Sequence, residues 1–199
     1  MILKNNDVAL KEALEHITIQ NKDFVTKTAV PAILRNAEVL DLEKAMGKTL
    51  KTISPDTVDC LDKLAANAQR FKIKSNTDTQ LLLEAISKDN KDFVFAEVLP
   101  HLADNADKYK ISRGGYIAGF IDAITPQNKD FMFNEAIPLI IKNMDKLGID
   151  ISEAAQIAKL ITKTNLKTIQ NIADNMDKFD IKDELSFLDI DKLSNYLTK

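Results

Sequence analysis

A motif that begins with Asn occurs five times along the chain without a gap, and it limits the possible fold more than any other feature. In every copy the Asn is followed at once by Ala or Met, and four residues later by Leu, Phe or Tyr. The repeated Asn residues are Asn36, Asn67, Asn105, Asn143 and Asn175. A motif that recurs at such intervals indicates an array of similar structural units.

Apolar residues fill the same four positions around every repeated Asn, which lie six and three residues before it and one and four residues after it. The first two positions hold Val30, Leu61, Leu99, Ile137 and Ile169, and then Ile33, Leu64, Leu102, Ile140 and Ile172. The other two hold Ala37, Ala68, Ala106, Met144 and Met176, and then Leu40, Phe71, Tyr109, Leu147 and Phe179. This spacing forms an apolar seam along a helix, here called helix A, and does not fit the alternation of a strand.

A break and a second amphipathic helix, here called helix B, follow helix A in each copy. The break residues are Asp41, Lys72, Lys110, Gly148 and Asp180. Gly or Asp in three of these five positions fits a left-handed backbone conformation. Helix B is expected to open on a capping residue, namely Ser75, Ser112, Ser152 or Asp183. Its predicted core face holds Leu82, Leu83 and Ile86, then Phe120, Ile121 and Ile124, and, in a fourth copy counted as two residues longer in its turn, Leu160 and Ile161.

Three of the A helices share a start signature, Asn-Lys-Asp-Phe, and a Pro five residues before the repeated Asn. The signatures begin at Asn21, Asn90 and Asn128, and the prolines are Pro31, Pro100 and Pro138. A Pro inside a helix removes a backbone hydrogen bond and kinks the helix, at a cost of about 3 kcal/mol. We expect a kink in these three helices and none where Asp62 or Gln170 takes the place of Pro.

These patterns predict an all-α fold, a right-handed superhelix (α-solenoid) of about five antiparallel helix-pair repeats with capping helices at both ends. The repeats cover about residues 21–54, 55–89, 90–127, 128–164 and 165–199, and a cap helix over about 7–19 precedes them. The chain has 199 residues, of which 45% are hydrophobic. This is enough for one ordinary domain, so we expect a single helical-repeat domain over 1–199.

The segment Val98-Leu99-Pro100-His101-Leu102, followed by Asp104 and then by Ile111-Ser112-Arg113, resembles a HEAT repeat. HEAT-like repeats have a kinked first helix, an Asp in the turn, and a hydrophobic-Arg pair at the start of the second helix. The resemblance covers about residues 21–182 at the level of architecture. It implies a curved stack of helices that binds another macromolecule, without specifying the partner.

Composition and charge restrict the classes of function. The net charge is −3, and the acidic and basic residues are interspersed, so a strong attraction for polyanions is not expected. The single cysteine, Cys60, excludes an intramolecular disulfide and a metal cage built of cysteines. The start of the chain lacks a signal-peptide core, and no later segment is apolar enough to cross a membrane. We expect a soluble, cytoplasmic protein.

Catalytic and metal-binding residue combinations are not apparent in the sequence. His16 and His101 lie apart from Cys and from paired carboxylates, and Cys60 is interpreted as a small buried residue. The repeated Asn could bind an extended ligand through its amide, but repeat proteins also need the same interface residue in every copy, and we favour that interpretation. We predict no cofactor, no metal and no enzymatic activity.

The third helix B opens with the glycine-rich stretch Gly114–Gly119. Each Gly in a helix costs up to about 1 kcal/mol relative to Ala, so three within six residues indicate close approach by another group. That group is a neighbouring helix or, alternatively, a ligand or partner. If a partner binds here, the candidate residues are Arg113, Gly115, Tyr116 and Gly119.

The expected function is that of a non-enzymatic scaffold or adaptor, which binds a protein or peptide on the curved surface of its B helices. A HEAT-like nucleic-acid-binding protein is the alternative, and it requires lysines gathered on one face. An enzyme is the third hypothesis and needs a pocket that the sequence does not reveal. The sequence leaves the partner and the oligomeric state open.

Overall fold

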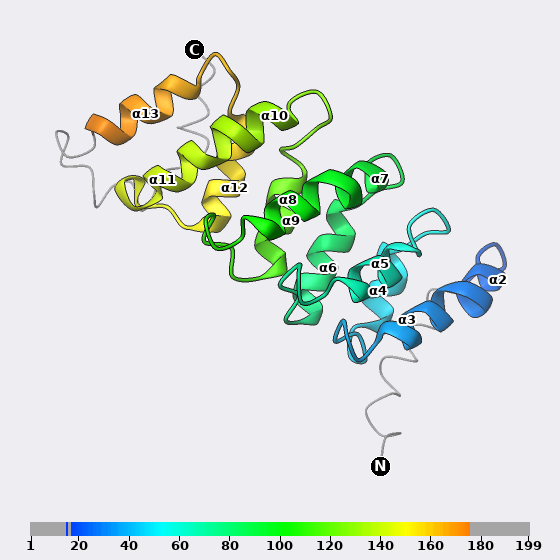
Figure 1. Ribbon diagram of the computed structural model, residues 1–199. Coiled ribbons are helices and arrows are strands. Elements are labelled where there is room, and N and C mark those ends of the chain that lie inside the picture. The colour runs from blue at the N-terminus through cyan, green and yellow to red at the C-terminus, as the bar shows by residue number, and fades with distance from the viewer. Residues whose placement is uncertain (1–14, 16, 176–199) are drawn as a thin grey trace. The chain divides into compact units, whose positions relative to one another are not determined.

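The computed structural model describes Glu15 and residues 17–175, and every regular element in that part of the chain is a helix (Figure 1). The first helices are α2 (Lys22–Phe24), η1 (Val25–Ala29), α3 (Val30–Asn36), α4 (Met46–Thr52), α5 (Cys60–Ala66) and α6 (Asn76–Ala85). They are followed by α7 (Lys91–Phe93), η2 (Val94–Val98), α8 (Leu99–Asp104), α9 (Gly114–Ile121), α10 (Lys129–Phe131), η3 (Met132–Ala136), α11 (Ile137–Leu147), α12 (Ile151–Leu160) and α13 (Leu166–Asn175). The all-α prediction is confirmed for these residues. Most of the predicted N-terminal cap, and the last helix B with Asp183, lie outside them.

The chain divides into two compact units, which are described separately. Unit 1 runs up to Asp104 and includes Arg113–Ala118, and unit 2 comprises Asn105–Ser112 and the chain from Gly119 onward. In unit 1, α3 packs against α4 and α5, and α4 packs against α6. In unit 2, α11 packs against α12 and α13. The superhelix of five repeats and the single domain over 1–199 stay predictions.

The predicted seam of helix A is buried in the described repeats at all but two positions. Ile33, Leu40, Leu64, Leu102 and Ile140 all have 0% of their surface exposed. Among the described seam positions only Val30 and Ile172 are half-buried; Met176 and Phe179 lie outside the described residues. The seam therefore forms the core of each unit. Burial of apolar surface contributes about 25 cal/mol per Å², which makes the seam the main source of stability.

π-helical turns lie next to the three prolines at which kinks are predicted. Each helix A with a Pro consists of a short α-helix, a π-helix of five residues and a second α-helix, and the Pro is at the second residue after the π-helix. The π-helices are η1, η2 and η3. A Pro has no N–H and clashes with the carbonyl group four residues earlier, and a π-turn relieves both problems by widening the helix locally. α5 and α13, which carry Asp62 and Gln170, are α-helices without such a turn.

The break after helix A is a left-handed residue in every described copy. Asp41, Lys72, Lys110 and Gly148 have φ values of 53°, 55°, 56° and 66°. The next residue donates its backbone N–H to the carbonyl group five residues earlier, as from Leu42 to Ala37 at 2.8 Å. The same bond occurs at Ile73, Ile111 and Ile149. This is a Schellman motif, which satisfies carbonyl groups at the end of the helix. The break is confirmed, including at the two lysines.

The fourth repeat differs from the prediction in two respects. Asp150, rather than Ser152, is the N-cap of α12, and it forms a capping box with Glu153. Ile161 is the extended C-cap of α12, as Ile86 is of α6, so Ile161 corresponds to Ile86 and not to Leu83. Ile157 and Ala158 fill the core positions instead, while Leu160 is half-buried. The prediction that this turn is two residues longer was wrong, because the N-cap places the start of α12 directly after the Schellman turn. Ser75 caps α6 as expected.

Candidate functional site

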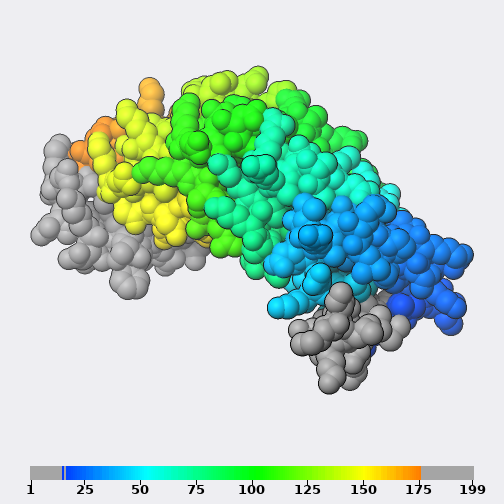
Figure 2. Space-filling model, turned by 60° about the horizontal axis from the view of Figure 1, so that its bottom comes forward, coloured from blue at the N-terminus to red at the C-terminus, as the bar shows by residue number. Residues whose placement is uncertain are grey.

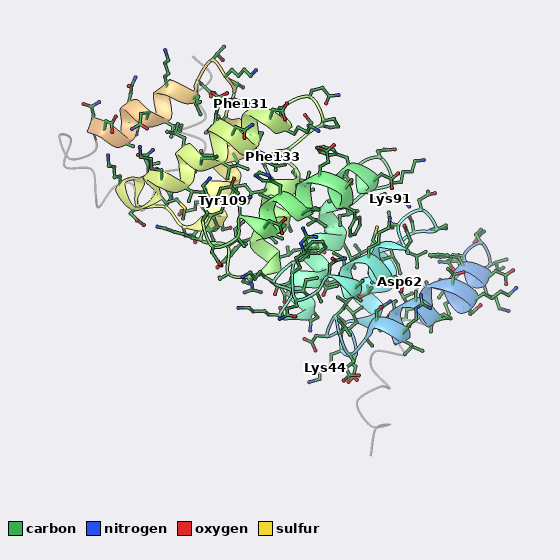
Figure 3. The ribbon with its side chains drawn as sticks, in the orientation of Figure 1. Lys44, Asp62, Lys91, Tyr109, Phe131 and Phe133 are labelled. Atoms are coloured by element: carbon green, nitrogen blue, oxygen red, sulfur yellow. The ribbon has the colours of Figure 1, made fainter. Side chains whose placement is uncertain are left out.

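The A helices of unit 1 are joined by ion pairs from one repeat to the next. Arg35 forms two hydrogen bonds to Asp62 with its Nη2 group, of 2.9 and 2.8 Å (Figure 3 labels Asp62). Asn36 also donates to Asp62, with 2.7 Å between Nδ2 and Oδ1. Arg70 pairs with Asp104 in the same way, at 2.9 Å. These bonds lower the pKa values of both aspartates below the ordinary range.

Unit 2 has two contacts at positions equivalent to these. Lys146 lies three residues after its repeated Asn, like Arg70, and pairs with Asp174 at 3.3 Å. Asp174 lies directly before the next repeated Asn, like Asp104. Asn143 donates to Gln170 at 3.3 Å, as Asn36 donates to Asp62. The recurrence of the same pairs in two units indicates that these residues connect neighbouring repeats.

The repeated Asn has the structural role that we favoured. Asn36, Asn67, Asn143 and Asn175 each donate their side-chain amide to the carbonyl group four residues earlier, at 2.7–3.0 Å. Two of them, Asn36 and Asn143, also contact the next repeat. The bonds to the carbonyl groups reach back into helix A, and the bonds of Asn36 and Asn143 to the next repeat fit the interface role. Their amides are thus used within the chain.

A second set of Asn residues connects the start of helix A to the end of the preceding helix B through side-chain hydrogen bonds. Asn90, Asn128 and Asn165 each accept from a backbone N–H three residues earlier, at 2.7–2.8 Å, and donate to a carbonyl group five residues earlier, at 3.0 Å. Asn90 and Asn128 begin the Asn-Lys-Asp-Phe signature, but Asn165 does not. The sequence did not reveal the role of Asn165, because the residues after it do not match the rest of the Asn-Lys-Asp-Phe signature.

The glycines of α9 are explained by close neighbours within the chain. An added Cβ at Gly114 would lie 3.1 Å from the carbonyl oxygen of Phe71, and one at Gly115 would lie 2.9 Å from Cδ1 of Leu81. At Gly119 the added Cβ would lie 2.9 Å from the Cβ of Ala155. Glycine suits this stretch because α9 approaches other parts of the chain closely. A ligand or partner is not needed to explain this stretch.

Two of the four candidate binding residues are brought together by a buried carboxylate, Asp78. Its Oδ1 atom accepts from Nε of Arg113 at 2.8 Å and from the backbone N–H of Gly115 at 2.9 Å. Asp78 has 0% of its surface exposed and also accepts from the backbone N–H of Lys74 at 3.0 Å. Sequence reasoning missed it; the only signal was its place three residues after Ser75, within reach of a helix cap.

The other two candidates have separate surroundings. Tyr116 is half-buried, and its backbone N–H donates to the carbonyl oxygen of Arg113 at 3.1 Å. Gly119 belongs to unit 2, where it faces Ala155. Binding of a partner by Arg113, Gly115, Tyr116 and Gly119 stays a prediction. Three of them already make close contacts inside the chain, which leaves Tyr116 and the outer part of the Arg113 side chain, 41% exposed, for a partner.

Replacing Gly119 with Ala tests the internal contact. The added methyl group overlaps Ala155, so α9 and α12 must shift, and we expect the free energy of unfolding to fall by about 1 kcal/mol after the gain in helix propensity is allowed for. Gly119→Ala combined with Ala155→Gly removes the overlap and should be more stable than the sum of the two single effects. Urea unfolding followed by circular dichroism measures this, and strictly additive effects would contradict the contact.

Reactive side chains do not converge on a site in the described chain. Burial, followed by the nearby charge of Asp59, raises the pKa of the Cys60 thiol to about 11, so the thiol is protonated at neutral pH and a poor nucleophile. His101 is half-buried on α8, and His16 lies outside the described residues. Within residues 17–175 no group of His, Cys, Asp and Glu side chains could hold a metal ion. None of the described helices is long and apolar enough to span a membrane.

A shallow, open cavity of about 550 Å³ lies in unit 1 beside the ends of α4 and α6. Its lining is rich in hydroxyl and carboxylate groups, and it consists of Thr52, Ser54, Asp56, Thr57, Leu83, Glu84, Ile86, Ser87, Lys88 and Asp89. Ser54 and Thr57 bond to each other, which occupies part of this polar surface.

Comparisons with known proteins do not identify the chain: no family, no curated protein and no solved structure matches it. The interpretation of its function therefore depends on the chain's own residues.

Proposed function

We propose that the protein is a non-enzymatic scaffold or adaptor, a right-handed HEAT-like solenoid that binds a protein or peptide along its B helices. The observation that carries this proposal is the recurrence of the contacts between A helices. Asn36 and Asn143, and likewise Arg70 and Lys146, make equivalent bonds to the next repeat in separate units. When repeats stack through the same contacts, each one extends a continuous surface, and repeat proteins use such extended surfaces for binding.

The buried polar groups of unit 1 connect its helices, as a stack of repeats requires. Gln80 donates to Thr49 at 2.6 Å, and Thr79 donates to the carbonyl oxygen of Leu40 at 3.0 Å. In the described part of the chain, every buried side-chain nitrogen and oxygen has a hydrogen-bond partner. The bonds of Gln80 and Thr79 join α6 to the first repeat.

Cross-linking of captured partners tests the proposal. The full-length chain, carrying an affinity tag, is incubated with a lysate of its source cells with and without nuclease, and then treated with a lysine-reactive cross-linker. We expect one protein in near-stoichiometric amount, resistant to nuclease, with cross-links to Lys48, Lys51 or Lys159 on the B helices. Capture of nucleic acid alone, or cross-links confined to the A helices, would overturn the proposal.

A further inference from the structure

One side of α3 is apolar and open to solvent. Leu34 has 58% of its surface exposed, Pro31 is exposed, and Val30 is half-buried. The three residues are neighbours on the helix surface, because they are three and four residues apart. Figures 1 and 2 show α3 in blue at one edge of unit 1. We call Val30, Pro31 and Leu34 the α3 face.

The positions of the α3 face are better covered in later repeats. Leu34 lies two residues before its repeated Asn, where Ala65 is half-buried and the other repeats have only 9%, 7% and 3% exposed, at Ala103, Ile141 and Ala173. Val30 lies six residues before the Asn, where the later residues are at most 1% exposed, namely Leu61, Leu99, Ile137 and Ile169. The first described repeat therefore exposes apolar surface that the later repeats bury.

In later repeats this side of helix A faces the preceding repeat. Asp62 and Gln170 lie five residues before their repeated Asn, like Pro31, and accept hydrogen bonds from the preceding repeat at 2.7 and 3.3 Å. The position of Leu34 is three residues further along, on the same side of the helix. In the described chain no complete helix precedes α2 and α3. The α3 face is therefore the open end of the interface that joins one repeat to the next.

Opposite charges lie at the two ends of the α3 face. Lys27 lies one turn before the face and Glu38 lies one turn after it, and both are exposed. The helical turn extends past α3 to Glu38, because the backbone N–H of Leu40 donates to the carbonyl oxygen of Asn36 at 3.0 Å. Lys27 pairs with Asp23 at 3.2 Å, yet 73% of the Lys27 side chain stays exposed. Each end of the face can therefore contribute a charge to an interface.

This order of charges suits a second copy of the chain. When two α3 helices pack antiparallel about a two-fold axis, Pro31 meets the partner's Leu34. Lys27 then meets the partner's Glu38, because both pairs are centred on the same point of the helix. A parallel packing would set Lys27 against the partner's Lys27, and like charges would meet. Charge complementarity therefore favours an antiparallel pair of identical chains.

We propose that the chain forms a two-fold dimer in which two α3 faces pack antiparallel, with a Lys27–Glu38 pair at each end. The apolar contacts provide the attraction, and the charges set the orientation. The face is small, so we expect a weak dimer with a Kd of about 100 μM, and the chain is monomeric at low micromolar concentration. The dimer uses A helices and the proposed function uses B helices, so that either proposal can fail without the other.

Sedimentation equilibrium of the full chain, from about 10 μM to about 1 mM, tests the dimer. We expect the average mass to rise from that of a monomer towards that of a dimer. Leu34→Asp should weaken the dimer at least about tenfold, because it places an unpaired carboxylate in the apolar contact. Val39→Asp is the matched control, since Val39 is 55% exposed but lies on a different side of the helix, and this variant should dimerise as the native chain does.

Exchange of the two charges tests the two-fold arrangement. Lys27→Glu and Glu38→Lys should each weaken the dimer, because each sets like charges against one another, and the variant with both changes should recover the native Kd. Circular dichroism shows whether each variant is folded. No recovery in the double variant, or equal losses in Leu34→Asp and Val39→Asp, would overturn the proposal. A native chain that stays monomeric throughout would also overturn it, and would leave the α3 face to another part of the chain or to a different protein.

Discussion

Replacing Leu64 with Ala is expected to lower the free energy of unfolding by about 2–5 kcal/mol. Leu64 lies three residues before a repeated Asn, on α5, and has 0% of its surface exposed. The substitution removes buried apolar atoms and leaves a cavity that the helices around α5 fill only in part. Since a domain is typically stable by about 5–15 kcal/mol, the loss should be plain in urea unfolding followed by circular dichroism.

Leu34→Ala is the matched control, because it makes the same chemical change in the same unit. Leu34 is only one residue after the seam position of Ile33, yet it is 58% exposed. Its truncation should change stability by no more than about 0.5 kcal/mol. Comparable losses in the two variants would contradict the assignment of the seam as the core.

The sequence predicted the core because the buried positions of a helix carry apolar residues at a regular spacing. Positions such as Ile33, Leu102 and Ile140 can be assigned by counting from the repeated Asn, and they are all fully buried. The break was predictable for the same reason, since Gly148 marks a backbone conformation that few residues adopt readily. At Lys72 and Lys110 the position in the repeat, rather than the residue type, was the signal.

Features that depend on contacts between distant residues could not be predicted in the same way. The prolines predicted a distortion of helix A, but not that it would take the form of a π-helical turn. The glycines of α9 predicted a close approach, but only the structure shows that Leu81 and Ala155 are the neighbours. Asp78 resembles a surface residue near a helix cap in the sequence, because its burial depends on Arg113, which is distant in the chain.

Replacing Asp78 with Ala should lower the free energy of unfolding by about 2–3 kcal/mol. The change leaves the backbone N–H groups of Lys74 and Gly115 without their carboxylate acceptor and removes the partner of Arg113. The loss is smaller than for a wholly buried pair, because the Arg113 side chain is 41% exposed and water can solvate it. Asp122→Asn, in the exposed pair with Lys159, is the control and should cost less than about 1 kcal/mol.

The pH dependence of Asp78→Asn separates the charge of Asp78 from its packing. Burial by itself would raise the pKa of Asp78, but hydrogen bonds from Arg113 and from the N–H groups of Lys74 and Gly115 outweigh it and hold the pKa below its ordinary value. A carboxylate with a lowered pKa stabilises the fold above the unfolded-state pKa of about 3.9, and this contribution is lost as pH falls through the lower folded-state pKa. The stability difference between the native chain and Asp78→Asn should therefore be constant near neutral pH and shrink below about pH 4. A difference that persists unchanged at lower pH would show that Asp78 acts through its shape and not its charge.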